Sequence, residues 1–295
     1  MRTIRILAII FYIFTVTQGY SQTVVGTGNA KFSLIVENSD NELEEYFSKD
    51  FESDFGRAVK VATEAASPFA VKFPVKIRVI VDVSDDAFNG ERSEDRIDIQ
   101  VGNRGMRIEK IKSIFWHEYG HEIFHLHLDK TAAGKESVFL NQIFLKSRES
   151  MNEVLRVYGK EVVEKADGWY GHNLNLLLES YDELLADVFR VMVKQDCDDN
   201  DLRNFRHLDL KNTKSTHSLL NPVRDYLWRS ELESNLNNQA KLLSVWKNLL
   251  AATLAEIDSR YLKFFGSSNR HLSWQAIKES INEDLIARFK AEKAK

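Results

Sequence analysis

The sequence is poor in cysteine and contains no dense cluster of basic residues. Cys197 is the single cysteine among 295 residues, so no disulfide can form within the chain. Aspartates surround it and disfavour its thiolate form, which argues against a cysteine nucleophile. The formal net charge is −4. Without a Lys/Arg block, neither nucleic acid nor an anionic membrane surface is indicated as a partner.

The sequence also lacks a long apolar run. The run near its start covers residues 6–16, follows Arg2 and Arg5, and leads to small residues that end at Ser21. As a helix it would extend about 16 Å, against a hydrocarbon core of roughly 30 Å. The pattern is typical of a secretory signal peptide over residues 1–21. We therefore expect a secreted or periplasmic protein without stable membrane insertion after signal cleavage, with an uncleaved anchor as the alternative.

Periodicity predicts strands only in the first third of the chain. The predicted strands cover residues 31–36, 75–83 and 96–101, with a helix at 41–66 and a polar loop at 84–95. Helical patterns follow at residues 137–165, 173–194, 222–228 and 238–265, and from 273 to the end. We expect an α+β protein: a small mixed sheet with a backing helix, an active-site helix, and a predominantly helical C-terminal lobe. The sub-domains would be residues 22–130 and 131–295.

Residues 111–127 read IKSIFWHEYGHEIFHLH and contain the pattern H-E-x-x-H. In a helix, His117 and His121 differ in direction by about 40° and in height by roughly 6 Å, so both imidazoles project from one face. Two neutral imidazoles at that separation can hold one zinc ion. Glu118 lies about 100° around the helix, where its carboxylate can take a proton from a metal-bound water. The pattern therefore predicts water activation at a zinc site.

A pattern this short also arises by chance, and the alternative is a purely structural pair of histidines. Its context favours the functional interpretation, because apolar residues at helical spacing surround it. They are Ile108, Ile111, Phe115 and Ile123.

A catalytic zinc usually has three protein ligands and one open position. His127 follows His117 by ten residues, as in the longer pattern H-E-x-x-H-x-x-G-x-x-H. That pattern needs a glycine where this chain has Phe124. If the helix continues, His127 points about 80° away and lies roughly 15 Å along the axis. We expect His125 and His127 to border a cleft or to lie on the surface instead.

The other route to a third ligand is the segment YDELLADVF. Glu183 and Asp187 are four residues apart on a helical pattern and share a face. Their like charges would cost a free helix about 0.2–0.5 kcal/mol unless a cation is near. One carboxylate on the metal and one on the far N–H of a ligating histidine would remove that conflict. The alternative is a solvated face on which these two residues pair with Arg190 and Lys194.

Together, the segments HEYGH and ELLAD resemble the gluzincin zinc peptidases, which include the thermolysin-like and neprilysin-like enzymes. The resemblance implies one zinc ion per chain, bound by His117, His121 and Glu183, with Glu118 as the catalytic base. It also implies Asp187 as the partner of a ligand histidine. The matching residues cover these two short segments only, so they indicate a superfamily of enzymes.

Enzymes of this family often use a His, Tyr or Arg beyond the third ligand as a hydrogen-bond donor to the oxyanion. Loss of such a donor costs about 2.7 to 4 kcal/mol. The candidates here are His217 and Tyr226, which flank a helix start at Asn221 and share that stretch with Arg224. His172 is a weaker candidate. The alternative is an ordinary loop and helix start.

We therefore expect an exported zinc metallopeptidase whose partners are protein or peptide substrates and whose water is activated by zinc and Glu118. The strand at residues 96–101 is the candidate for aligning a substrate through main-chain hydrogen bonds. Two alternatives are a zinc hydrolase of a non-peptide amide or ester, and a non-catalytic exported binding protein. The presence of Glu118 argues against the second, because a structural metal site has no use for that carboxylate.

Overall fold

The computed structural model covers the chain in segments. It describes residues 21–25, 32–38, 49–69, 76–82, 88–93, 96–102, 108–193, 205, 215–265 and 274–295. Residues 1–20, which make up nearly all of the predicted signal peptide, lie outside the described residues, as does Cys197. Among the helices that are described, none is both long and apolar enough to cross a lipid bilayer.

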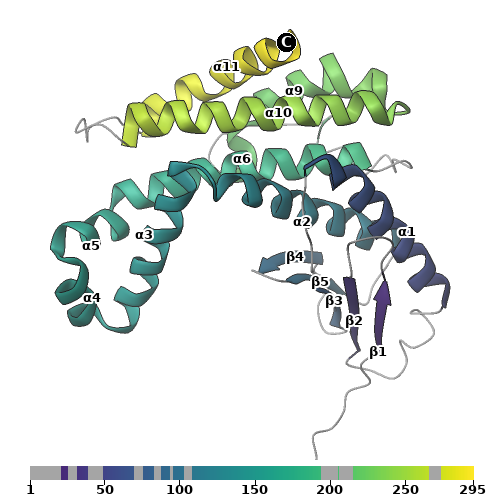
Figure 1. The fold of residues 1–295 in the computed structure, drawn as a ribbon, viewed down its shortest axis with the longest axis horizontal. Coiled ribbons are helices and arrows are strands. Elements are labelled where there is room, and N and C mark those ends of the chain that lie inside the picture. The colour runs from purple at the N-terminus through teal and green to yellow at the C-terminus, as the bar shows by residue number, and fades with distance from the viewer. Residues whose placement is uncertain are drawn as a thin grey trace, which may run out of the picture.

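Helices form the body of the protein in stacked layers (Figure 1). α2 (Ile108–Leu128) and α6 (Trp169–Val193) lie side by side in the central layer. α10 (Gln239–Arg260) packs over α6, and α11 (Trp274–Lys293) packs over α10. α1 (Lys49–Ala66) packs against α2. The shorter elements of the body are η2 (Ser67–Phe69), α8 (Thr216–Leu219), α9 (Asn221–Leu227), η3 (Trp228–Leu232), η4 (Glu233–Asn235) and η5 (Tyr261–Phe265).

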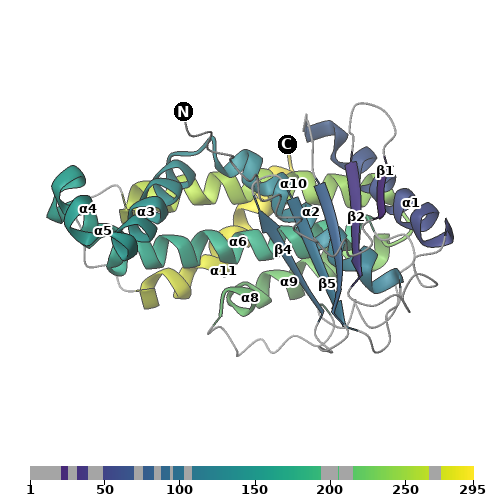
Figure 2. The ribbon, with the colours of Figure 1, turned by 90° about the horizontal axis from the view of Figure 1, so that it is seen from below.

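An arm of three helices extends from this body, at the end opposite to α1 and the strands (Figure 2). It consists of α3 (Ala132–Glu149), α4 (Met151–Tyr158) and α5 (Lys160–Asp167), and it encloses a small apolar cluster of its own. The sequence predicts one helix over residues 137–165, whereas the structure breaks it twice. Gly159 adopts a φ of 81°, a left-handed conformation that glycine tolerates and that ends α4.

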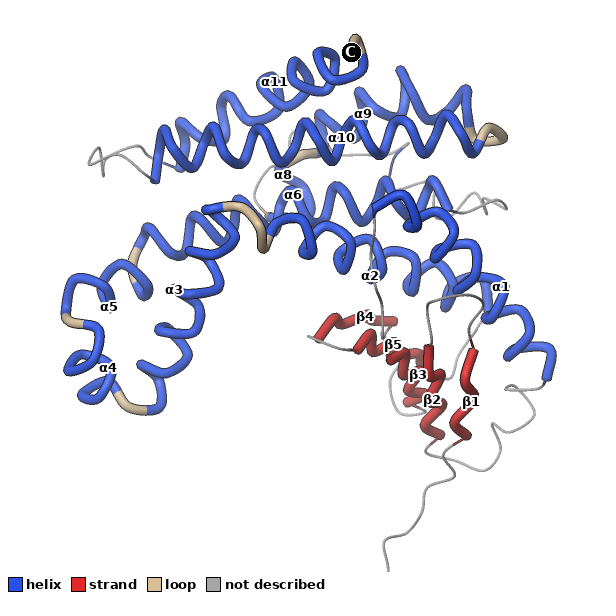
Figure 3. The backbone as a smooth tube through the Cα atoms, viewed as in Figure 1, coloured by secondary structure: helices blue, strands red, loops and turns tan. Residues whose placement is uncertain are grey.

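Five strands run beside the helical body in the order β1-β2-β3-β5-β4 (Figure 3, red). They are β1 (Ser21–Val25), β2 (Phe32–Asn38), β3 (Lys76–Asp82), β4 (Phe88–Ser93) and β5 (Arg96–Gly102). β2, β3 and β5 are parallel, and the edge strands β1 and β4 are antiparallel to their neighbours. Two expectations about this region are wrong. Residues 84–95, expected as a polar loop, contain β4, because β5 pairs with that segment. β5, expected to align a substrate, lies between β3 and β4 and has neighbours on both sides.

The fold class expected from the sequence, α+β, is also corrected. All side chains that the structure describes belong to helices or to the connections between them, apart from those of Ile97 and Ile99. The body formed by these side chains is therefore all-α. The physical reason is that the large apolar residues that bury one another come from the long helices, while the strands contribute two isoleucines to the described core.

One continuous apolar core joins the helices before and after residue 130. Two tryptophans tie its layers together by hydrogen bonds. Trp116 of α2 donates from Nε1 to the carbonyl oxygen of Ala58 in α1, 3.2 Å away. Trp246 of α10 donates from Nε1 to the carbonyl oxygen of Leu185 in α6, 3.1 Å away. The central pair α2 and α6 is thus held from both sides, which fixes the side chains that face each other between them.

Candidate metal centre

The H-E-x-x-H pattern lies in the middle of α2, as its periodicity predicts. Phe115, Tyr119 and Ile123 are fully buried and anchor one face of the helix in the core. His117 and His121 project together from another face, with ring centroids 4.6 Å apart and ring planes nearly perpendicular at 86°. Their Nε2 atoms are 3.1 Å apart. Two histidines one helical turn apart thus point their nitrogens at the same point in space.

Gly120, inside the pattern, sets the distance between α2 and α6. A methyl group on Gly120 would come within 2.7 Å of the Cα atom of Ala186, which is fully buried in α6. Only a residue without a Cβ lets the two backbones approach this closely. Ala186 lies between Glu183 and Asp187, so the close contact brings both carboxylates up to the histidines. Gly120 in HEYGH and Ala186 in ELLAD, which have no predicted chemical role, therefore serve to pack the two helices together.

Glu183 brings one carboxylate oxygen near each of the two histidines. Its Oε2 lies 3.4 Å from His117 Nε2, and its Oε1 lies 3.8 Å from His121 Nε2. In a tetrahedral zinc site with bonds of about 2.0 to 2.1 Å, ligand atoms lie about 3.3 Å apart. The separations of 3.1 Å between the Nε2 atoms and 3.4 Å from His117 Nε2 to Glu183 Oε2 are close to that value, and Glu183 approaches His121 Nε2 with its other oxygen, at 3.8 Å. The residues present therefore fit a zinc ion.

Glu118 lies beside the same point. Together with one nitrogen of each histidine, a carboxylate oxygen of Glu118 forms a group whose atoms all lie within 4.8 Å of one another. The side chain is buried. Burial raises the pKa of Glu118 above its ordinary value, and the neighbouring histidines oppose that change. Glu118 is thus a carboxylate close to a metal position and shielded from bulk water.

The far nitrogens of both histidines meet carboxylates from α6. Asp187 Oδ1 lies 3.2 Å from His117 Nδ1, and Asp182 Oδ1 lies 2.7 Å from His121 Nδ1. A carboxylate at Nδ1 favours the tautomer with hydrogen on Nδ1 and a lone pair on Nε2. Two Nε2 lone pairs 3.1 Å apart repel each other unless a proton or a metal cation lies between them. The pairing of both rings therefore leaves two Nε2 atoms directed at one position that a metal cation can occupy.

Asp187 is held in place by two arginines. Arg224 Nε lies 2.9 Å from its Oδ2, and Arg190 Nη2 lies 3.1 Å from its Oδ1. Burial alone would raise the pKa of Asp187, but Arg224, His117 and Arg190 hold it well below its ordinary value. The predicted pairing with Arg190 thus exists, but the face is not solvated, because the side chains of Asp187 and Glu183 are only 15% and 17% exposed.

The ring of His117 lies in a strongly negative field. Burial alone would lower its pKa, whereas the carboxylates of Asp187 and Glu183 raise it to about 9. Burial alone would raise the pKa of Glu183, but His117 and His217 hold it well below its usual range. When the histidines are neutral, as metal ligands are, Glu118, Asp182, Glu183 and Asp187 oppose the two arginines at Asp187, which leaves a formal excess of two negative charges. Without a metal, protonation of His117 offsets part of that excess, and a divalent cation would take over this role.

Of the two expected oxyanion donors, only His217 is near the cluster. It belongs to α8, its Nδ1 lies 2.9 Å from Glu183 Oε2, and its side chain is 71% exposed. Tyr226 instead packs against Phe289 of α11, with Lys290 over its ring. The reason is helical geometry, because Tyr226 follows Arg224 by two residues and points to nearly the opposite side. His172 is exposed, and no described contact joins it to the cluster.

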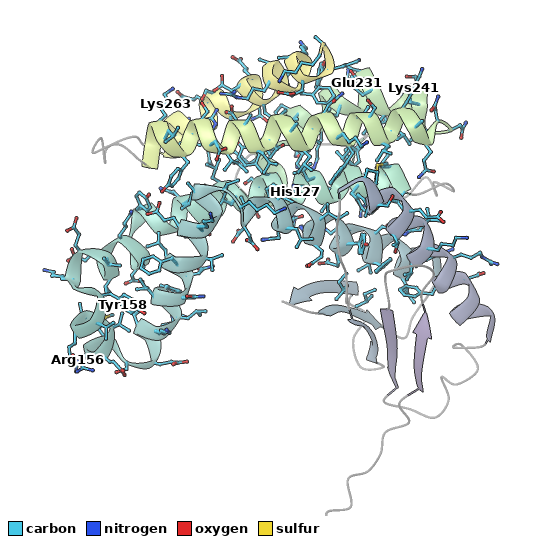
Figure 4. The ribbon with its side chains drawn as sticks, viewed as in Figure 1. His127, Arg156, Tyr158, Glu231, Lys241 and Lys263 are labelled. Atoms are coloured by element: carbon cyan, nitrogen blue, oxygen red, sulfur yellow. The ribbon has the colours of Figure 1, made fainter. Side chains whose placement is uncertain are left out.

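The continuation of α2 excludes His127 as a ligand, as predicted. Phe124 is fully buried and the helix runs on to Leu128. His127 lies near the C-terminal end of α2 (Figure 4). His125, expected at a cleft or on the surface, instead has its Nε2 2.8 Å from Asp182 Oδ2.

Asp182 was not recognised from the sequence. The four-residue spacing between Glu183 and Asp187 predicts a role for Glu183, whereas Asp182 belongs to no known short pattern. A signal was nevertheless available: His117, His121 and His125 recur every four residues, which extends the polar face of α2 by one turn. Asp182 lies beside Glu183 on the opposing helix α6, where its carboxylate can contact the turn of α2 that carries His121 and His125.

Compared with protein-family models, with curated proteins and with solved structures, the chain has no significant match.

Proposed function

We propose that this protein is a zinc-dependent hydrolase that cleaves peptide bonds. The observation that carries the proposal is the convergence of His117 Nε2, His121 Nε2 and the two carboxylate oxygens of Glu183, at separations of 3.1 to 3.8 Å, near the edge of a tetrahedral zinc site. A shared cation would hold the two imidazole nitrogens at this 3.1 Å separation, at which they form a ring-to-ring hydrogen bond when one of them carries a proton.

Glu118 supplies the base. A bound zinc ion would lower the pKa of a water molecule to about 7 and polarise a substrate carbonyl. The Glu118 carboxylate takes a proton from that water and gives it to the leaving amine. Its burial favours this role, because a raised pKa makes the carboxylate a better proton acceptor. Glu118 does not need to bind the metal, since His117, His121 and Glu183 would supply three ligands.

His217 is the candidate donor to the oxyanion. Its contact with Glu183 lies at the edge of the cluster, and its largely exposed ring leaves room for a substrate beside it. Glu183 raises the pKa of His217, which favours the protonated ring, and an N–H of the ring can donate a hydrogen bond as the substrate carbonyl oxygen becomes negative. The guanidinium of Arg224 supports this position by donating from Nη1 to the backbone carbonyl oxygen of His217, 2.8 Å away.

The choice of peptides as substrates rests on the resemblance of HEYGH and ELLAD to the gluzincin peptidases. The chemistry of activated water would equally serve another amide or an ester. The test is a panel of unstructured proteins, peptides, small amides and esters, incubated with zinc-loaded protein and with protein treated with a chelator. We expect cleavage of peptide bonds that the chelator removes and added zinc restores. Cleavage of small amides or esters alone would overturn the peptidase assignment.

A further inference from the structure

The carboxylate of Asp182 bridges two histidines of α2. One oxygen, Oδ1, lies 2.7 Å from Nδ1 of His121, and the other, Oδ2, accepts a hydrogen bond from Nε2 of His125 at 2.8 Å. The Asp182 side chain is 13% exposed, while that of His125 is 30% exposed. Each carboxylate oxygen therefore has its own imidazole partner, and the chain of three groups runs from the metal position towards the surface.

Asp182 precedes Glu183 on α6 and places its Oδ1 2.7 Å from the Nδ1 atom of His121. An ionised carboxylate at Nδ1 keeps the hydrogen of the ring there and leaves Nε2 free to bind a metal.

The two ligand histidines are supported in different ways. Behind His117, Asp187 is held by the permanently charged Arg190 and Arg224. Behind His121, the partner of Asp182 is His125, which donates one hydrogen bond and need not carry a charge. No arginine is described as a partner of Asp182, so its negative charge is less neutralised than that of Asp187. It therefore interacts more strongly with the imidazole ring of His121.

We propose that Asp182 is a positioning residue of the metal site, and that His125 acts through it by fixing the orientation of its carboxylate. This inference rests on the proposed metal site. His125 belongs to no zinc-binding pattern. The proposal gives it an effect on metal affinity that acts through the Asp182 carboxylate and the His121 ring.

The test is the zinc affinity of the full chain, measured by competition with a chromophoric chelator. We expect Asp182→Ala to weaken zinc binding about 10- to 100-fold, as is typical for residues that support a ligand histidine. Asp182→Asn keeps an acceptor oxygen but loses the charge, so its loss should be smaller. His125→Gln should also show a smaller loss. The double variant Asp182→Ala/His125→Gln should bind zinc no more weakly than Asp182→Ala alone, because His125 acts through Asp182.

Glu179→Gln is the matched control. Glu179 is an exposed carboxylate on the same helix, three residues before Asp182, and no described hydrogen bond or salt bridge joins it to His121 or His125. Because Asp182 and Glu183 act on Glu179 electrostatically, the zinc affinity of Glu179→Gln should fall slightly but clearly less than that of Asp182→Asn, which separates positioning from a general loss of negative charge. Circular dichroism of each variant checks that it is folded. If Asp182→Ala does not fold, the zinc affinity of Asp182→Asn tests the proposal in its place.

Substitution of cobalt for zinc gives a second measurement. The visible spectrum of a cobalt site depends on ligand geometry, so Asp182→Ala should shift its bands, whereas Glu179→Gln should leave them unchanged. If the wild type binds zinc and both Asp182 variants bind it equally well, the positioning role is overturned. If the losses of the single variants multiply in the double variant, His125 does not act through Asp182. A wild type that binds no zinc would instead overturn the proposed function.

Discussion

Two regions of this protein bury clusters of charged side chains, and they differ in charge balance. Between α10 and α11, Glu256 pairs with Arg260 and Arg288, and Arg260 pairs also with Asp284. Two carboxylates there meet two guanidinium groups. Between α2 and α6, four carboxylates meet only two guanidinium groups, and the Nε2 atoms of two imidazole rings face each other.

The difference separates structural pairing from binding. A buried cluster whose charges cancel links its helices and requires no bound ion. A cluster that concentrates uncompensated negative charge in a buried position is costly unless a cation completes it. The experiments below ask whether the two regions behave in these two ways, beginning with the largest expected effect.

Glu118→Gln should abolish most activity without removing the metal. The amide cannot accept a proton from water, and general-base catalysis contributes about 10²- to 10⁴-fold in rate. A rate assay on the best substrate of the panel measures the loss, and elemental mass spectrometry measures zinc in the same sample. Unchanged activity in this variant would show that the carboxylate is not the base, and would favour a non-catalytic binding protein.

Glu256→Gln should destabilise the fold but leave zinc binding intact. It leaves Arg260, which is 3% exposed, and Arg288 without their shared carboxylate. Removal of one partner of a buried ion pair typically costs about 3 to 5 kcal/mol. Urea denaturation measures the free energy of unfolding. Glu183→Gln is the matched variant at the site, and it should lose the increase in melting temperature that zinc gives to the wild type. If Glu256→Gln also lost that increase, the two regions would not be independent.

Gly120→Ala should weaken both stability and zinc affinity. The added methyl group would lie 2.7 Å from the Cα atom of Ala186, so α2 and α6 must move apart. Overpacking of this kind costs about 1 to 3 kcal/mol. The same movement separates the histidines from Glu183, so zinc affinity should fall in parallel. A variant with full stability and full zinc affinity would mean that the helices can accommodate the methyl group without moving.

Glu136 should give a smaller, pH-dependent contribution to stability. It joins the arm to the body through Tyr170 and Tyr261, and it pairs with Lys165 within the arm. Burial alone would raise its pKa, but these three partners lower it below the ordinary value. Because the folded-state pKa is the lower one, the contribution is present above the unfolded value of about 4.5 and is lost as the pH falls through the folded-state pKa.

Unfolding free energies measured between about pH 6 and about pH 3 test this. Glu136→Gln should be less stable than the wild type at the upper end of the range, and the difference should shrink towards the lower end. A difference that stays constant over the whole range would contradict the proposed charge contribution of Glu136.

Local patterns predicted much of the candidate site but not its surroundings. The four-residue spacing of His117 and His121 follows from helix geometry alone, and so does the shared face of Glu183 and Asp187. The contact between Asp182 and His125 was not predicted, because it joins residues of two different helices that are 57 positions apart in the chain. Tyr226 was wrongly expected at the site, since sequence alone does not tell which side of a short helix faces the cluster.

The same limit explains the errors in the fold. Helix periodicity located α1, α6, α10 and α11 because each buries one continuous face. The segment containing β4 carries a polar pattern, and only its pairing with β5 makes it a strand. The class was predicted as α+β because strand patterns are visible in the sequence. How little those strands contribute to the described core depends on packing that no local pattern records.

The most direct test of the account is the zinc content of the chain, purified without chelator and measured by elemental mass spectrometry. A site with three protein ligands predicts about one zinc ion per chain. Replacement of Glu183 by glutamine should lower that content, whereas replacement of Glu256 by glutamine should not. If folded wild-type protein held no zinc, even after zinc was added back, His117 and His121 would not form a metal site. The excess negative charge between α2 and α6 would then need another explanation.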